Sequence, residues 1–85
     1  MTFEDLKFEE LPHDRGIQSR VQFKNGYGAS IIKGPYSYGG TNGLYELAVL
    51  DEDGRIAYDT DITDDVCGFL CEAEVTALLM QIESL

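Results

Sequence analysis

The pattern of apolar and polar positions alternates with a period of two through much of the chain. Such alternation is typical of half-buried strands, and clusters of Gly, Pro, Asn and Asp separate the alternating runs. Pro12 ends the first run, which makes that segment a candidate edge strand. We therefore predict strands at about residues 6–11, 17–24, 27–33, 44–50 and 55–59.

Near the end of the sequence, the apolar period becomes that of an amphipathic helix. Apolar residues recur there three and four positions apart, which predicts a helix over about residues 72–84 with Cys71 at its cap. Gly68 separates it from a short helix predicted over about residues 64–69, whose cap would be Thr63. The stripe that should pack on the sheet is Val75, Leu78, Leu79, Ile82 and Leu85.

The dipeptide Asn25-Gly26 marks a hairpin turn, for which two registers compete. A two-residue turn would give the core face small or polar partners. A three-residue loop ending in a left-handed Gly26 would instead place Phe23 opposite Tyr27. We predict the three-residue loop, because it uses the apolar pattern on both strands.

A second hairpin turn is predicted at residues 51–54, where three acidic residues precede a glycine. Placing Leu50 opposite Arg55 would set Leu47 against Tyr58, on the face that receives the helix. The elements together predict an α+β fold. It would be an antiparallel meander sheet of four to five strands, covered on one face by the C-terminal helix.

Length and composition bound the class of protein. A chain of 85 residues with 44% apolar content suits one small domain, spanning residues 1–85. So small a core leaves little room for an active-site cavity, so we expect no enzymatic activity. The start of the chain does not resemble a secretory signal, and no apolar run approaches the roughly 18 residues of a membrane span. We expect a cytoplasmic protein with no membrane partner.

A glycine-rich loop joins the third and fourth predicted strands, over residues 34–43. Four glycines and a proline prevent regular structure there. Tyr36 and Tyr38 would be rigid anchors for a partner if they point outward. Alternatively, one or both rings fold back over the end of the sheet as a lid. The lysine of a phosphate-binding P-loop is missing, which excludes that interpretation.

Charge is segregated along the chain. The net charge is −10; residues 1–45 hold five charges of each sign, whereas residues 46–85 hold Arg55 against eleven carboxylates. Such a surface repels a nucleic-acid backbone and attracts basic protein surfaces. A merely soluble acidic surface is the alternative. The predicted partner-binding residues are Tyr36, Tyr38, Asp51, Glu52, Asp53, Asp59, Asp61, Asp64 and Asp65.

The densest acidic segment suggests a calcium site but lacks the full pattern. Asp59, Asp61 and Thr63 fall on alternate ligand positions of an EF-hand loop. Asp64, however, stands where that loop requires glycine, and Leu70 stands where it requires a bidentate glutamate. A plainer interpretation is that the two carboxylates after Thr63 lie in the first turn of the short helix, where the helix dipole favours negative charge.

The two cysteines do not complete a metal site either. Cys67 and Cys71 are four positions apart, as on one helix face, and are too few for a disulfide scaffold. His13 would add only a third donor from a distant segment. We predict two reduced thiols, no bound metal and no cofactor.

Three segments carry a resemblance to known proteins. They read SYGG at 37–40, GLYELAVL at 43–50 and YDTDITDDV at 58–66. In that order they resemble small accessory proteins encoded by tailed bacteriophages, and the resemblance spans most of the chain. It implies a phage origin and the cytoplasm of an infected bacterium. No activity is established for that group, so the resemblance implies no site residue.

Two functions from different classes are consistent with these patterns. The first is a non-enzymatic binding protein whose acidic half occupies a basic surface on a host protein, as anti-defence proteins including some anti-CRISPRs do by mimicking the charge of DNA. The second is a small metal-dependent or nucleotide-handling enzyme using the carboxylates at 59–65, which have no His, Lys or Ser placed beside them. A homodimer through a sheet edge, the first strand, is a further possibility for the binding protein.

Overall fold

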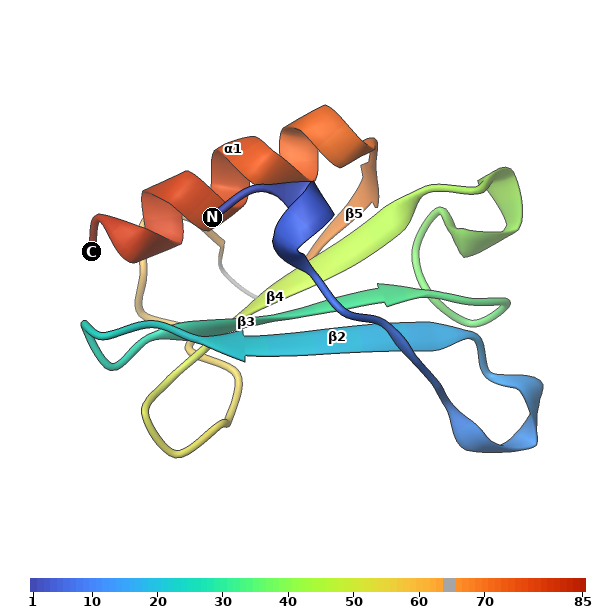
Figure 1. Ribbon diagram of the computed structural model, residues 1–85, viewed down its shortest axis with the longest axis horizontal. Helices are drawn as coiled ribbons and strands as arrows, with labels where there is room; N and C mark the ends of the chain where they lie inside the picture. Colours follow the sequence, from blue (N-terminus) through green and yellow to red (C-terminus); the bar gives the residue numbers. More distant parts are fainter. Residues whose placement is uncertain (64–65) are drawn as a thin grey trace.

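The computed structural model describes residues 1–63 and 66–85, and its centre is a five-stranded antiparallel sheet (Figure 1). The strands lie in chain order, so each pairs with its neighbours in sequence. Helix α1, Glu72–Glu83, lies across one face of this sheet. The predicted α+β meander with a C-terminal helix is therefore confirmed. The strands are β1 Glu9–Glu10, β2 Ile17–Gln22, β3 Gly28–Lys33, β4 Tyr45–Leu50 and β5 Val66–Leu70.

The core lies between α1 and one face of the sheet. Successive side chains of a strand point to opposite faces, so alternate residues of the central strands meet the helix stripe. Burying each large apolar side chain contributes about 1.5–3 kcal/mol. Leu85, predicted to continue the stripe, lies beyond the end of α1 and is 44% exposed. The most deeply buried side chains are Ile31, Leu47, Val49, Val75, Leu79 and Ile82.

The hairpin between β2 and β3 has the predicted three-residue loop. Val21 pairs with Ala29, and the N–H of Phe23 donates to the carbonyl of Tyr27 at 2.7 Å. Gly26 has a φ of 92°, the left-handed conformation that this bulged turn requires. The register inferred from the apolar pattern is confirmed.

The turn at 51–54 has the same geometry as the first turn. The N–H of Asp51 donates to the carbonyl of Arg55 at 2.7 Å. Gly54 has a φ of 80°, in the position that a left-handed glycine also occupies in the first turn. Asp51 and Arg55 therefore close a three-residue loop, and the predicted pairing of this hairpin was wrong by one residue.

The predicted strand at 55–59 is reduced to one isolated bridge, between Leu50 and Ile56. A one-residue shift exchanges the two faces of a strand. As a result Ala57 is buried in the core, whereas Tyr58 is 64% exposed. The chain then leaves β4, because the edge of β4 pairs instead with β5.

Strand β5 occupies most of the segment that was predicted to be a short helix at 64–69. The first turn of that helix falls on residues 64 and 65, which lie outside the described residues. From Val66 onward the chain pairs with β4, with Cys67 opposite Leu47. The buried backbone of β4 needs hydrogen-bond partners along its outer edge, and an extended apolar segment supplies them where a helix could not.

The predicted first strand, 6–11, is shortened to β1, which pairs through only two residues with β2. The preceding residues turn over the core instead. The rings of Phe3 and Phe8 pack on Tyr45, with centroids 5.0 and 5.7 Å from it. Apolar contact with the core, more than strand pairing, thus positions this segment.

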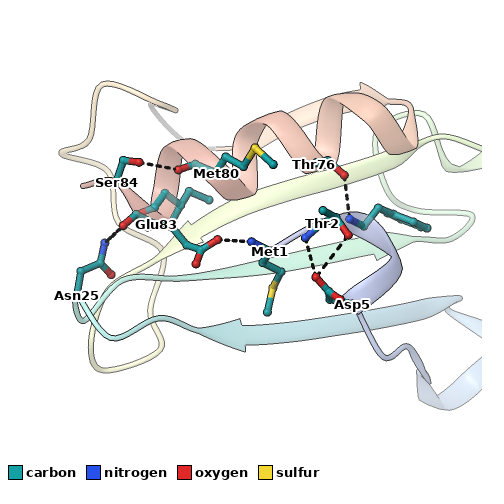
Figure 2. A network of polar contacts seen from close by, with 10 residues as sticks. Met1, Thr2, Asp5, Asn25, Thr76, Met80, Glu83 and Ser84 are labelled. Atoms are coloured by element: carbon teal, nitrogen blue, oxygen red, sulfur yellow. Dashed lines mark hydrogen bonds and ion pairs between the residues drawn. The ribbon is translucent and has the colours of Figure 1, made fainter.

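Polar contacts join the N-terminal segment and the first hairpin to α1 (Figure 2). The N-terminal ammonium of Met1 forms an ion pair with Glu83. The N–H of Phe3 donates to the hydroxyl of Thr76 at 2.8 Å, and the amide of Asn25 donates to carbonyls at the end of the helix. Both termini of the chain therefore lie on the helix side of the sheet.

Candidate partner-binding site

The structure places the predicted partner-binding residues at opposite ends of β4. The tyrosine loop at 34–43 precedes this six-residue strand, and the acidic turn at 51–54 follows it (Figure 1). A strand of that length spans about 17–20 Å. The loop tyrosines and the turn carboxylates are therefore not brought together. Two further members of the set, Asp64 and Asp65, lie outside the described residues.

We call the end of the sheet that carries the turn at 51–54 and the segment after it, to residue 61, the acidic end. The turn and this segment enclose an open cleft of about 520 Å³. Asp51, Glu52 and Asp59 line this cleft together with Tyr27 and Tyr58. The two tyrosines were absent from the predicted set. The first hairpin turn brings one of them to the cleft, and the corrected register after the acidic turn brings the other.

Asp51 also has a structural role. Its Oδ1 accepts hydrogen bonds from the backbone N–H groups of Asp53, at 2.9 Å, and Arg55, at 3.0 Å. An aspartate in this arrangement stabilises a turn through its own side chain. Glu52 and Asp53 are exposed at the tip of the turn. The carboxylates best placed to meet a partner are therefore those at the tip, with Asp51 supporting their backbone.

Among the described residues of the second half of the chain, the carboxylates are almost entirely without ion-pair partners. Within residues 1–63 and 66–85, the ion pair found is the one between the Met1 ammonium and Glu83. Arg55 forms no ion pair with any carboxylate in those ranges. Charges of one sign reinforce one another over about 8 Å at physiological ionic strength. The carboxylates described at this end therefore have no ion-pair partner, although the guanidinium of Arg20 donates to the carbonyl of Gly54 in the turn at 2.8 Å.

At the other end of β4, Tyr36 and Tyr38 both point outward, 84% and 63% exposed. Neither forms the lid that was the alternative to a binding role. The backbone of Tyr38 is nevertheless fixed, because its N–H donates to Glu46 Oε1 at 3.1 Å and its carbonyl accepts from the N–H of Phe69 at 3.0 Å. These bonds fix the point at which the Tyr38 side chain leaves the backbone.

Phe69 adds a further exposed ring beside Tyr38. It is 57% exposed and has a φ of 56°, a left-handed conformation that is unfavourable for a bulky residue. Two glycines allow the chain segments to cross here. A Cβ at Gly68 would lie 2.4 Å from the Cβ of Tyr38, and a Cβ at Gly39 would lie 2.8 Å from the Cα of Phe69. This exposed ring was not predicted from the sequence, because residues 64–69 were assigned to a short helix.

The candidate metal ligands are dispersed over the molecule. His13 lies in the turn between β1 and β2, whereas Cys67 belongs to β5 and Cys71 precedes α1 as its N-cap. Both cysteines are free thiols. Asp59 and Asp61 are exposed on the segment after the acidic turn. Throughout the part of the chain that the structure describes, no three His, Cys, Asp or Glu side chains are grouped to hold a metal ion.

Comparison with known proteins adds no relative. No family model, curated protein or solved structure matches this chain. Among the helices in residues 1–63 and 66–85, none has both the length and the apolar character needed to cross a membrane. Function therefore has to be argued from the geometry and charge of the chain itself.

Proposed function

We propose that this protein is a small non-enzymatic binding protein whose acidic end occupies a basic surface of another protein. One observation carries the proposal: the carboxylates of residues 46–85 lack cationic partners among the described residues, apart from the Glu83 pair with the N-terminus. A partner rich in Lys and Arg would supply the missing counter-charges. Long-range attraction would also accelerate the encounter.

The cleft at the acidic end suits a basic side chain of such a partner. A guanidinium can stack on the face of a tyrosine ring while its N–H groups donate hydrogen bonds to carboxylates. Tyr27 and Tyr58 supply rings, and Glu52 and Asp59 supply carboxylates around one cavity. We place recognition of an Arg or Lys side chain there, with the exposed Asp53 and Asp61 acting at longer range.

The resemblance to phage accessory proteins suggests the class of partner. We propose a nucleic-acid-binding protein of an infected bacterial host, which this protein would inhibit as an anti-defence factor in the host cytoplasm. A surface that binds a phosphate backbone through Lys and Arg would also attract the carboxylates. The same negative potential disfavours direct binding of nucleic acid by this protein.

Matched charge variants test the proposal. Immobilised protein is used to capture partners from a bacterial lysate, each captured protein is identified, and its affinity is measured with purified components. We expect an acidic-end variant to bind at least about tenfold more weakly, a loss of about 1.4 kcal/mol. A control with the same change in charge in the first half should stay close to wild type. The acidic-end variant is E52Q/D53N/D59N/D61N, and the control is E4Q/E9Q/E10Q/D14N.

Two outcomes would contradict the proposal. One is an equal loss in both variants, which would indicate that only net charge matters. The other is an affinity that the acidic-end variant leaves unchanged. Both variants alter exposed side chains, so both are expected to fold, and circular dichroism checks this directly.

A further inference from the structure

A second cleft, of about 450 Å³, lies at the end of the sheet remote from the acidic turn. It opens between the turn that joins β1 to β2 and the tyrosine loop. Leu11, Ile32 and Tyr36 give it apolar and aromatic walls, and His13 and Arg15 also line it. Pockets with apolar walls and a few convergent polar groups are the usual form of small-molecule sites.

Backbone contacts hold the two sides of this cleft at a fixed separation. A Cβ at Gly34 would lie 2.0 Å from the carbonyl oxygen of Arg15, and a Cβ at Gly16 would lie 2.2 Å from that of Lys33. Only glycine allows the two turns to approach so closely. The main chain therefore fixes the separation of the two segments whose side chains line the cleft.

The turn that carries the basic residues is strained. His13 and Asp14 have consecutive left-handed conformations, with φ of 60° and 55°. A non-glycine residue adopts this conformation at a cost in free energy, and such residues cluster at functional sites. The N–H of Leu11 donates to the carbonyl of Gly16 at 2.8 Å, which closes the turn around them. His13 and Arg15 therefore lie within one turn closed by a backbone hydrogen bond.

The unused hydrogen-bonding capacity of this cleft lies on two side chains, His13 and Arg15. Within residues 1–63 and 66–85, the side chains of His13 and Arg15 form no hydrogen bond or ion pair. The other polar side chains of the lining are engaged. Ser37 bonds to the backbone of its own loop at 3.0 Å, and Glu46 accepts a backbone N–H at 3.1 Å.

We propose that this cleft binds a small organic anion, a carboxylate or phosphate monoester carried on an aromatic or aliphatic body. The guanidinium of Arg15 would bind the oxyanion through two donors, and His13 would supply another. The apolar body would lie against the ring of Tyr36. The carboxylate of Glu46 would repel the anion and so orient its charged group toward Arg15. The site lies at the other end of the sheet from the acidic cleft and does not rest on the proposed partner.

Chemical-shift titration of the full-length protein tests this site. The probes are benzoate and phenyl phosphate, compared with acetate and inorganic phosphate at constant ionic strength. We expect saturable shifts confined to residues 11–16 and 32–38 and to Glu46, with a Kd of about 1 mM or tighter for at least one aromatic anion. The two aromatic probes distinguish a carboxylate site from a phosphate site. Acetate and inorganic phosphate, which lack an aromatic ring, should bind at least about fivefold more weakly than the aromatic anions.

Variants connect the shifts to the named residues. Arg15→Gln keeps the backbone carbonyl at the glycine contact and should weaken binding by about tenfold. Tyr36→Ala removes an exposed ring that the fold does not need. It should weaken the binding of the aromatic anions but not that of acetate. Arg55→Gln, at the acidic turn, is the control and should bind as wild type. Shifts no larger than those from sodium chloride, or binding unchanged in both Arg15→Gln and Tyr36→Ala, would overturn the proposal.

Discussion

The side-chain amide of Asn25 donates a hydrogen bond to the carbonyl of Ile82 at 2.8 Å, which joins the first hairpin turn to the last turn of α1 (Figure 2). The last carbonyls of a helix have no donors within the helix. The Oδ1 of the same amide accepts the N–H of Tyr27 at 3.0 Å. One side chain thus stabilises both the turn and the helix end.

Replacing this amide should destabilise the protein measurably. Asn25→Ala should lower the free energy of unfolding by about 1–2 kcal/mol, because helix carbonyls and a turn N–H lose their partner. Asn25→Asp should lower it further, since a carboxylate cannot donate and lies at the negative end of the helix dipole. Urea denaturation measures both. The neighbouring control Lys24→Ala should change stability by less than about 0.5 kcal/mol. Equal stability of Asn25→Ala and this control would contradict the assignment.

The left-handed backbone of Phe69 predicts an unusual order of stability. Phe69→Gly should be more stable than Phe69→Ala by about 1 kcal/mol, because glycine adopts positive φ without the clash that alanine retains. In an ordinary strand glycine is the less stable of the two. Thermal denaturation of the two variants measures the difference. An alanine variant as stable as the glycine variant would mean that position 69 is not strained.

The register after the acidic turn is tested by two neighbouring residues. Ala57→Asp should lower the free energy of unfolding by about 3 kcal/mol or more, because it buries an unpaired carboxylate. Tyr58→Asp, at a residue that is 64% exposed, should change it by no more than about 0.5 kcal/mol. The register predicted from the sequence would reverse this order. Urea denaturation of the two variants therefore decides between the registers.

Stability at low pH should depend on Glu74. The backbone N–H of Cys71, at 3.0 Å, and then its thiol lower the pKa of this carboxyl below its ordinary value of 4.5. The folded state thus favours the charged form, and its contribution to stability is full above about pH 4.5 and lost as the pH falls through the lowered pKa. The stability difference between wild type and Glu74→Gln should therefore be larger at pH 6 than at pH 2.5. A difference that stays constant with pH would contradict this, and Glu72→Gln controls for removing a carboxylate from the same turn.

The two hairpins show when the strand register can be predicted from the sequence. Large apolar residues flank the first turn on both strands, so only one register pairs Phe23 with Tyr27 on the core face. After the second turn, either register directs an apolar residue to the core. The larger side chains of Ile56 and Tyr58 favoured the predicted register, whereas in the structure the small Ala57 belongs to the buried core.

Strand β5 and the second cleft depend on contacts between distant segments. The run Val66–Leu70 does not alternate, and short apolar runs do not distinguish a buried strand from a helix. Its pairing with β4 is what makes this run a strand. The charge of the acidic end could be read directly from composition. The cleft beside His13 could not, because its walls come from three separate segments and its left-handed backbone has no sequence signature.

The most direct test of the acidic end as a binding surface is the association rate with the captured partner at increasing ionic strength. We predict that kon falls by at least about tenfold between 0.05 and 0.5 M salt while koff changes little, because the attraction acts before contact. The E52Q/D53N/D59N/D61N variant should flatten this dependence, whereas E4Q/E9Q/E10Q/D14N should retain it. A kon independent of ionic strength in the wild-type protein would contradict the account.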